Sequence, residues 1–313
     1  MVPRMALTAR DLEILSAVHR HRLLRSTHLV ALTGASRQAI LRRLQLLFHH
    51  SYLDRPLIQL DWYARGSEPM VYALGRRGAE ALAQRGEVHR RGVRWDTKNR
   101  NLSRVFLHHT LAVAEVMVAF DAACRQRPDV DFIRADDILA AGPAATRGLQ
   151  RPFRWQIDAR AGGKRHQLGV EPDGVLGVRF RGLAPNRSRQ FFFVEADRGT
   201  MPVVRKGLTR SSFARKLLAY RETWRQAVHK AHFGIPGFRV LTVTASPERL
   251  GHLVAACRSL PTGGARLFLF APASQLSAGN VLTMPWVDGR GQPAKLLEPS
   301  RRTPGHLRPT ESP

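Results

Sequence analysis

The chain has 313 residues, 43% of them hydrophobic, so it is long enough to bury a core in about two domains and is not disordered throughout. Its 50 Lys and Arg residues outnumber 24 Asp and Glu residues, which gives a formal net charge of +26. Such a charge favours a polyanionic partner. We expect double-stranded DNA rather than a membrane surface, because no basic amphipathic helix or lipidation motif stands out.

The cysteines and the hydropathy of the chain exclude several other classes of protein. Cys124 and Cys257 lie far apart and outside any CxxC pattern, so neither a disulfide framework nor a zinc site is indicated. No stretch approaches the roughly 20 apolar residues of a transmembrane helix. The N-terminal segment MVPRMALTAR lacks the apolar region of a signal peptide, and we therefore expect a cytoplasmic protein.

The first expected elements form a helix-turn-helix. Thr8 begins a helix whose apolar residues recur at helical spacing, and Ser26 or Thr27 begins a short second helix that ends at Gly34. Ser36 then caps a third helix, which has apolar residues on one face and Arg and Gln residues on the other. In such a layout the third helix of a DNA-binding domain lies in the major groove.

A wing and a closing helix follow the third helix. PLIQLDWYA and MVYAL predict two strands around the loop RGSEP, and GAEALAQR predicts the closing helix. The whole order resembles the winged-helix DNA-binding domains of bacterial regulators, and we assign this domain to residues 1–85. A winged helix used as a protein-interaction module, with a solvated basic face, is the alternative.

The winged-helix resemblance implies which residues contact DNA. Arg37 and Gln38, at the start of the third helix, are the candidates for base contacts, and the later arginines of that helix are the candidates for phosphate contacts. Arg65, at the tip of the wing, is the candidate for the DNA backbone or the minor groove. The predicted DNA-binding set is Ser36, Arg37, Gln38, Arg42, Arg43 and Arg65.

A second domain follows a polar, basic linker at residues 86–102. A long apolar helix over residues 103–126 is expected to pack against a sheet. The expected strands of that sheet are FRWQIDAR, VLGVRF, QFFFVEA, FRVLTVTA and ARLFLFA. A helix between the third and fourth strands has an inner face of Phe213, Leu217, Tyr220, Trp224 and Val228. SPERLGHLVAACRSL, with a Ser cap and Pro in its first turn, predicts a helix between the last two strands.

This order of elements is typical of a restriction-endonuclease-like α/β domain, which we assign to residues 103–288. A doubly wound nucleotide-binding sheet is the alternative, but no GxGxxG or GxxxxGK[ST] motif opens any of the helices. Residues 289–313 are basic and rich in Pro and are expected to form a disordered tail. The predicted fold is therefore α/β (α+β), with a winged helix followed by a nuclease-like domain.

The segments EPDGV and FFFVEAD space carboxylates as a metal-dependent nuclease core does. Glu195 and Asp197 share one face of a strand, and Asp173 is expected to reach them from a neighbouring strand. Together with Glu115 on the long helix, these residues are the candidate ligands for Mg²⁺. The pattern looks like the PD-(D/E)XK nuclease motif, except that Asp197 stands where that motif has a lysine. The alternative for Asp197 and Arg198 is that they pair with neighbouring residues and fix the end of the strand.

A lysine from the following helix is expected to replace the missing strand lysine. Lys206 and Lys216 are the candidates, and the predicted catalytic set is Asp173, Glu195 and Lys216. Two interpretations remain open: a Mg²⁺-dependent endonuclease or nickase, and a non-cleaving relative that keeps the fold and binds DNA. The departure at Asp197 favours the second.

Two adjacent histidines, His108 and His109, lie on the long helix. One of them is expected to face the core and the other to face outward. His109 and Glu115 are not on one face of a helix, so a metal site between these two residues is not expected.

The order of motifs along the chain resembles one family over roughly residues 8–275. After the winged helix come LHHTLAVAEV, EPDGVL and FFFVEADRGT, and then a helix that contains KLLAY. This combination resembles the replication-relaxation family of plasmid and integrative-element proteins. The resemblance implies a DNA-associated role in replication control, relaxation or mobilisation, and it implies that the Asp at position 197 is part of the family's pattern. A relaxase or replication protein and a second copy of the chain are further candidate partners, and a transcriptional repressor of a mobile element is a third interpretation.

Overall fold

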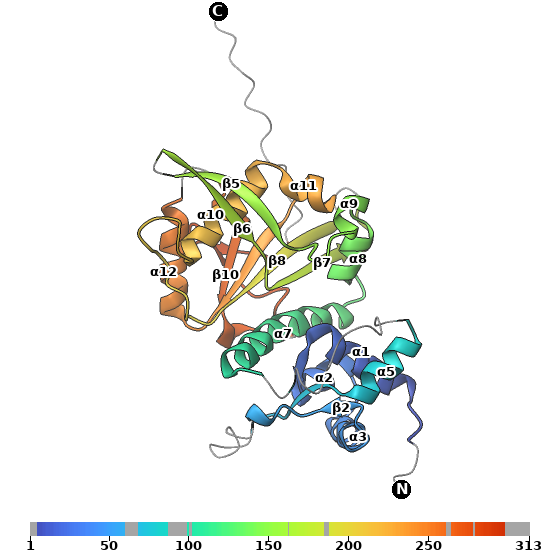
Figure 1. Ribbon diagram of the computed structural model, residues 1–313. Coiled ribbons are helices and arrows are strands. Elements are labelled where there is room, and N and C mark those ends of the chain that lie inside the picture. Colours follow the sequence, from blue (N-terminus) through green and yellow to red (C-terminus); the bar gives the residue numbers. More distant parts are fainter. Residues whose placement is uncertain are drawn as a thin grey trace, which may run out of the picture.

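The computed structural model describes residues 5–59, 68–86, 99, 102–161, 163–184, 188–260, 264–277 and 279–297. The chain folds into two units of helices and strands (Figure 1). An N-terminal unit lies at the bottom of the view, and a larger C-terminal unit, built on a mixed sheet, lies above it. The long helix α7 lies between them. The predicted α/β class is confirmed.

The N-terminal unit packs short helices around a small antiparallel sheet with the strand order β1-β3-β2. Thr8 forms a capping box with Asp11, Gly34 takes a left-handed conformation that ends the second helix, and Ser36 caps the third, as predicted. The elements are α1 (Ala9–His21), β1 (Leu23–Arg25), α2 (Ser26–Thr33), α3 (Arg37–His49), β2 (Leu53–Asp54), β3 (Val71–Leu74) and α5 (Arg76–Gln84).

The strands that follow α3 differ from the expected pair. Among the described residues, the strands that pair with β3, which lies in MVYAL, are β1 and β2. Within the expected strand at 56–64, Leu57–Gln59 form a 3₁₀ turn, and residues 60–64 lie outside the described residues. The strand β1 was not expected, because a strand of three residues shows too little alternation of polar and apolar side chains to be recognised.

The helix α7 (Arg104–Arg125) is buried on two sides. One face packs Val116 and Phe120 against the sheet of the C-terminal unit, as predicted. Another face packs Leu107 and Leu111 against β1 and β3 of the N-terminal unit. This second contact was not expected from the sequence, and it joins the two units through a single rigid element.

Burial on two sides explains the composition of α7. Among the described residues it is the one helix that is long and apolar enough to cross a membrane, judged by length and composition alone. This finding corrects the expectation that no segment of the chain meets that criterion. Half of the apolar stretch is buried inside the protein, because the sheet covers one face and the N-terminal unit covers another.

The C-terminal unit is built on a sheet of strand order β12-β11-β10-β9-β8-β7-β4. Antiparallel pairs join β4, β7 and β8, parallel pairs join β8, β9 and β10, and β11 and β12 add an antiparallel edge. The strands are β4 (Val130–Arg134), β7 (Gly174–Phe180), β8 (Arg189–Asp197), β9 (Arg239–Thr244), β10 (Phe268–Pro272), β11 (Trp286–Asp288) and β12 (Pro293–Ala294). The helices are α8 (Ala135–Ala140), α9 (Ala144–Arg147), α10 (Phe213–Arg225), α11 (Val228–Phe233) and α12 (Pro247–Arg258).

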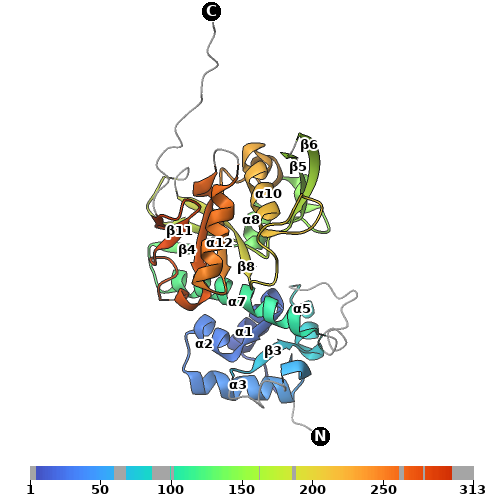
Figure 2. The same ribbon diagram turned by 90° about the vertical axis from the view of Figure 1, so that its left-hand side faces the viewer.

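Helices cover both faces of this sheet. α7 packs on the face that carries Phe192 and Val194, and α10 and α12 pack on the face that carries Phe193 and Val240. Figure 2 shows α10 and α12 in front of the sheet and α7 below it. Ser246 caps α12, as predicted from its sequence. A hairpin of β5 (Trp155–Ala161) and β6 (Lys164–Val170) packs on α10 and shields that side of the sheet.

The segment FRWQIDAR is a strand, but it does not belong to the large sheet. It forms β5, which pairs with β6 in a separate hairpin. The first strand of the antiparallel series is instead β4, and neither β4 nor β6 was expected from the sequence. The helix after β8 also ends earlier than expected: α10 stops at Arg225, Ala227 takes a left-handed conformation, and Trp224 is exposed rather than on the inner face.

Residues in the expected linker and in the expected tail take part in folded structure. Most of the linker at 86–102 lies outside the described residues, but Asn99 is buried and donates to Asp54 and to the Leu74 carbonyl of the N-terminal unit. At the other end, β12 pairs with β11 and Leu296 is buried, so the folded unit continues past residue 288. The remainder of the expected tail, residues 298–313, lies outside the described residues.

Candidate functional site

A buried carboxylate, a lysine and a tyrosine meet near the end of β8. Glu195 lies on the strand face that α10 covers, and only 2% of it is exposed. Lys216 Nζ lies 2.5 Å from Glu195 Oε2, and the Tyr220 hydroxyl donates to Glu195 Oε1 at 2.6 Å. Lys216 and Tyr220 are one turn apart on α10, so one face of that helix supplies both partners.

Asp173 lies beside this cluster, immediately before β7. Its Oδ2 accepts a hydrogen bond from the Ala196 backbone N–H at 2.9 Å, and its Oδ1 lies 3.2 Å from His109 Nε2. Asp173 and Lys216 are close enough for the charge of each to shift the pKa of the other. The structure therefore brings Asp173, Glu195 and Lys216 together, as the sequence predicted, and adds His109 from α7.

Burial and the neighbouring charges set the protonation of this cluster. Burial raises the pKa of Glu195 to about 7; the Lys216 ammonium opposes this shift and the Asp173 carboxylate reinforces it. Burial also disfavours the charged form of Asp173, but the hydrogen bond with His109 and the charge of Lys216 outweigh it and lower the pKa of Asp173. The same hydrogen bond raises the pKa of His109. Near neutral pH, Glu195 is therefore partly protonated while Asp173 is ionised.

Asp197 has a separate set of partners. It forms a bidentate ion pair with Arg249 of α12, at 2.7 and 3.0 Å, and accepts a hydrogen bond from the Thr244 hydroxyl at 2.9 Å. Arg249 also donates to the Met201 carbonyl in the segment that follows β8. Asp197 thus fixes the end of β8 to α12. These contacts agree with the alternative in which Asp197 fixes the end of the strand, and a metal-ligand role for Asp197 stays a prediction.

Glu115 is the second expected ligand that lies elsewhere. Its Oε2 lies 2.8 Å from His28 Nε2 and 3.3 Å from Arg25 Nη1, and both of these residues belong to the N-terminal unit. Glu115 therefore links α7 to α2. Because His109 contacts Asp173 and Glu115 contacts His28, the two residues form no common site, as expected from their spacing.

The carboxylate oxygens of the cluster already have partners within the protein. Both oxygens of Glu195 are occupied by Lys216 and Tyr220, and both oxygens of Asp173 are occupied by the Ala196 amide and His109. A cation at these oxygens would have to displace an ammonium group and a histidine. Within the part of the chain that the structure describes, no group of three His, Cys, Asp or Glu side chains is arranged to hold a metal ion.

The outer face of α3 is the second candidate site. The Ser36 hydroxyl accepts a hydrogen bond from the Ala39 backbone N–H at 3.3 Å and so fixes the start of the helix. Arg37, Gln38 and Arg42 are exposed, as expected for residues that contact a ligand. In both ribbon views α3 lies at the end of the molecule that is far from the large sheet (Figures 1 and 2).

Arg43 has a different role from the expected phosphate contact. Its Nε and Nη2 lie 2.5 Å from the two carboxylate oxygens of the buried Asp11, and Nη2 also donates to the Ala6 carbonyl. Burial disfavours the charged form of Asp11, but the hydrogen bonds from Arg43 and Thr8 outweigh it and lower the pKa of Asp11. Arg43 therefore fixes α3 to the start of α1. The remaining candidate, Arg65, lies outside the described residues.

Sequence reasoning missed several partners of the carboxylates. Tyr220 was placed on the inner face of its helix without a polar role, although its i+4 spacing from Lys216 is a usable signal: a helix that presents Lys216 to β8 presents Tyr220 to the same strand. His109 and Arg249 gave no such signal, because they come from elements that are distant in the sequence from Asp173 and Asp197.

The comparison with known proteins identifies one family. No curated protein matches the chain. A family model described as replication-relaxation matches residues 15–237, which is more than half of the chain and includes α3, α7, β8 and α10. The matched region contains both candidate sites, the cluster around Glu195 and the outer face of α3. The chain therefore belongs to the replication-relaxation family.

Proposed function

We propose that this chain is a DNA-binding protein of a plasmid or integrative element that acts in replication control, relaxation or mobilisation. Membership of the replication-relaxation family supports a role in replication or relaxation. In this proposal the N-terminal unit is a winged helix that reads duplex DNA. The C-terminal unit is a restriction-endonuclease-like domain that contacts phosphates without cleaving them, and the protein acts in the cytoplasm.

The exposed face of α3 is the observation that carries the proposal. α3 follows the turn at Gly34 and directs Arg37, Gln38 and Arg42 to solvent. No carboxylate of the described residues forms an ion pair with Arg37 or Arg42, so both guanidinium groups are available for phosphate oxygens or for the acceptors of guanine. Gln38 has the donor and acceptor that suit adenine. These are the side chains that a recognition helix uses.

The order of elements supports a nuclease-like C-terminal unit. α7 is followed by β4, and after α8, α9 and the β5–β6 hairpin come the strands β7 and β8, which continue the antiparallel part of the sheet. α10, α11 and the parallel strand β9 come next, so the order matches once the inserted helices and hairpin are set aside. This helix, three strands, helix, strand order is the one expected of a restriction-endonuclease-like core. Glu195 already has Lys216 and Tyr220 as partners on its two oxygens, and these contacts support a unit that does not cleave.

Duplex binding tests the first part of the proposal. The affinity of the full chain for a labelled duplex is measured by fluorescence anisotropy at several salt concentrations, for the parent and for Arg37→Ala with Arg42→Ala. Loss of two phosphate contacts weakens binding and reduces the slope of log K against log salt by about 1.8. The control is Arg160→Ala with Lys164→Ala, which removes the same charge from the β5–β6 hairpin. Parent-like affinity and slope in the α3 variant overturn the proposal.

Cleavage tests the second part. Supercoiled plasmid is incubated with the protein in Mg²⁺, Mn²⁺ or EDTA, beside an Asp173→Ala, Glu195→Ala double variant. We expect plasmid that stays intact and shifts on a gel. Metal-dependent nicking that disappears in the double variant would instead identify an endonuclease or nickase that uses Lys216.

The position of the bound site separates replication control from repression. Footprinting on the element that encodes the protein is expected to protect an origin or a transfer region. Protection of a palindromic site at a promoter would instead identify a repressor, which usually binds as a dimer.

A further inference from the structure

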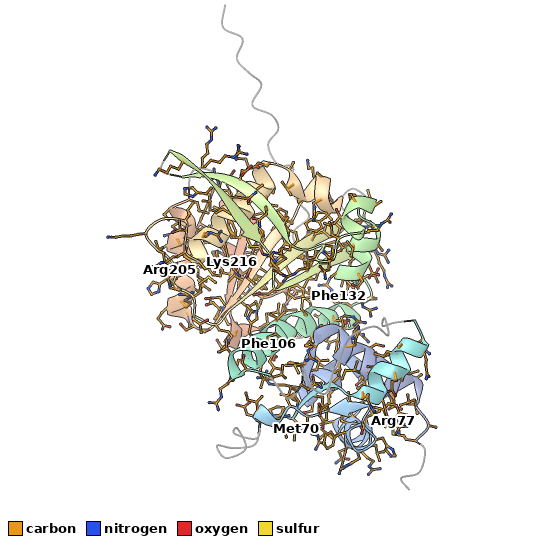
Figure 3. The ribbon with its side chains drawn as sticks, viewed as in Figure 1. Met70, Arg77, Phe106, Phe132, Arg205 and Lys216 are labelled. Atoms are coloured by element: carbon orange, nitrogen blue, oxygen red, sulfur yellow. The ribbon has the colours of Figure 1, made fainter. Side chains whose placement is uncertain are left out.

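The start of α7 and the segment between β8 and α10 form an exposed cationic surface. Arg198 Nη1 donates to the Val105 carbonyl at 2.9 Å and so joins the two elements. Residues 198–221 include no Asp or Glu. Their basic residues are Arg198, Arg205, Lys206, Arg210, Arg215, Lys216 and Arg221. Figure 3 shows Phe106 at the start of α7, with Arg205 and Lys216 above it.

The segment is held in place, although its basic side chains at positions 205, 206 and 210 are exposed. The Phe213 and Ala214 backbone N–H groups donate to the Pro202 and Val203 carbonyls, and Arg215 Nε donates to the Leu208 carbonyl at 2.9 Å. These bonds tie the segment to the start of α10. A fixed backbone presents its cations in a defined arrangement, which lowers the entropic cost of binding a polyanion.

Three of the basic residues on this segment are not neutralised by a carboxylate of the described residues. Arg205, Lys206 and Arg210 are exposed, and within the described residues no carboxylate forms an ion pair with any of them. The nearby carboxylate of Glu195 is shielded from solvent, because this residue is 2% exposed and is paired with Lys216. The surface therefore attracts a negatively charged chain.

An exposed aromatic ring lies at the start of α7, below Arg205 and Lys216 in the view of Figure 3. Phe106 is 44% exposed and is not part of any buried core cluster, and the neighbouring Val105 is 66% exposed. One turn further along α7, His109 is 40% exposed at its side chain and contacts Asp173. Phe106 and His109 share a helix face, so the exposed ring lies next to the Asp173, Glu195 and Lys216 cluster.

We propose that this surface binds single-stranded DNA. The α7–loop surface is defined here as Phe106, His109, Arg198, Arg205, Lys206 and Lys216. In a single strand the base faces are accessible, so a base stacks on Phe106 while successive phosphates contact the cations of the segment. In a duplex the base faces are stacked inside the helix and cannot contact the exposed Phe106 ring. The surface therefore favours a single strand. This inference rests on the proposal that the C-terminal unit contacts phosphates, and it is independent of α3.

A labelled dT oligonucleotide and the full-length chain provide the test. Phe106→Ala is expected to weaken dT binding about tenfold, whereas Phe106→Tyr keeps the affinity because it keeps the ring. Arg205→Ala with Lys206→Ala is expected to reduce the slope of log K against log salt by about 1.4. All of these side chains are exposed, and circular dichroism checks that the variants fold.

Matched variants distinguish single-strand binding at the α7–loop surface from a general effect of net charge and from duplex binding at α3. Arg160→Ala with Lys164→Ala removes the same charge from the hairpin and is expected to leave dT binding unchanged. Arg37→Ala with Arg42→Ala is expected to weaken duplex binding and to keep dT binding. Parent-like dT affinity in Phe106→Ala, or an equal loss in the hairpin variant, overturns the inference. Parent-like duplex binding in the α3 variant overturns the duplex proposal alone.

Discussion

Two adjacent arginines on α3 have opposite roles. Arg43 holds a carboxylate, Asp11, that is fully buried, whereas Arg42 is exposed. Arg43→Ala leaves that carboxylate without its cation, so we expect the free energy of unfolding to fall by about 2 kcal/mol. Arg42→Ala is expected to change it by less than about 0.5 kcal/mol. Urea unfolding at neutral pH measures both variants, and equal effects would contradict this division of roles.

The raised pKa of Glu195 predicts a pH-dependent stability. The usual pKa of this carboxyl is 4.5, and burial raises it to about 7 in the folded chain. Between these values the unfolded chain releases the proton and the folded chain keeps it. The stabilising contribution of Glu195 is therefore complete below pH 4.5 and is lost as the pH rises toward 7, by about 3 kcal/mol at about 1.4 kcal/mol per pKa unit.

The variant Glu195→Gln isolates this effect, because its amide has no proton to release in that range. Its free energy of unfolding, relative to the parent, is expected to increase between pH 4.5 and pH 7. Denaturant titrations at several pH values measure the difference. Asp173 and His109 also titrate, but they are present in both proteins, so most of their contribution cancels. A difference that does not change with pH would show that Glu195 is already ionised in the folded chain.

At the scale of elements, α7 determines how the two units are coupled. Leu111 of α7 is fully buried against the N-terminal sheet, whereas Val105 on the same helix is 66% exposed. Leu111→Ala is expected to lower the free energy of unfolding by about 3 kcal/mol, because it opens a cavity at the contact between the units. Val105→Ala, the matched control, is expected to change it by less than about 0.5 kcal/mol. A small loss in Leu111→Ala would mean that the units are not held together through this face.

The expected placement of β5 in the large sheet was wrong for a physical reason. The strand signal in residues 153–160 was correct, because Trp155, Ile157 and Ala159 alternate with polar residues and their face packs on α10. Alternation shows that a strand is half buried, but it does not show which strand is its neighbour. The central strand β8 is a continuous apolar run, because helices cover both of its faces. The difference between an alternating and a continuous apolar pattern distinguishes the hairpin strand β5 from the central strand β8.

The candidate site was predictable where it depends on local spacing. The positions of Asp173, Glu195 and Lys216 near one another follow from adjacent strands and the next helix, and the structure brings them together. The pairing of Asp197 with Arg249 and of Glu115 with His28 depends on how distant elements pack. Residue spacing carries no information on such contacts, so the partners of these two carboxylates could not be predicted from it.

At the scale of the whole molecule, the two proposed surfaces belong to different units. α3 lies at the free end of the N-terminal unit, and the α7–loop surface lies on the C-terminal unit and on the first turns of α7 (Figure 1). Because α7 packs against both units, the two surfaces are held at a fixed separation. The net charge of +26 attracts both duplex and single-stranded DNA. In the two proposals, the duplex binds at α3 and the single strand binds at the α7–loop surface.

This arrangement predicts a preference for DNA that is part duplex and part single strand. A duplex with a dT tail of about 20 nucleotides engages both surfaces, so the second contact forms within the complex at a high effective concentration. We expect the tailed duplex to bind at least about tenfold more tightly than the same duplex with blunt ends. Phe106→Ala should remove this gain and leave blunt-duplex binding unchanged, whereas Arg37→Ala with Arg42→Ala should weaken both. Competition measured by anisotropy gives the ratios, and equal affinity of the parent for tailed and blunt duplexes would show that the two surfaces do not bind one DNA molecule together.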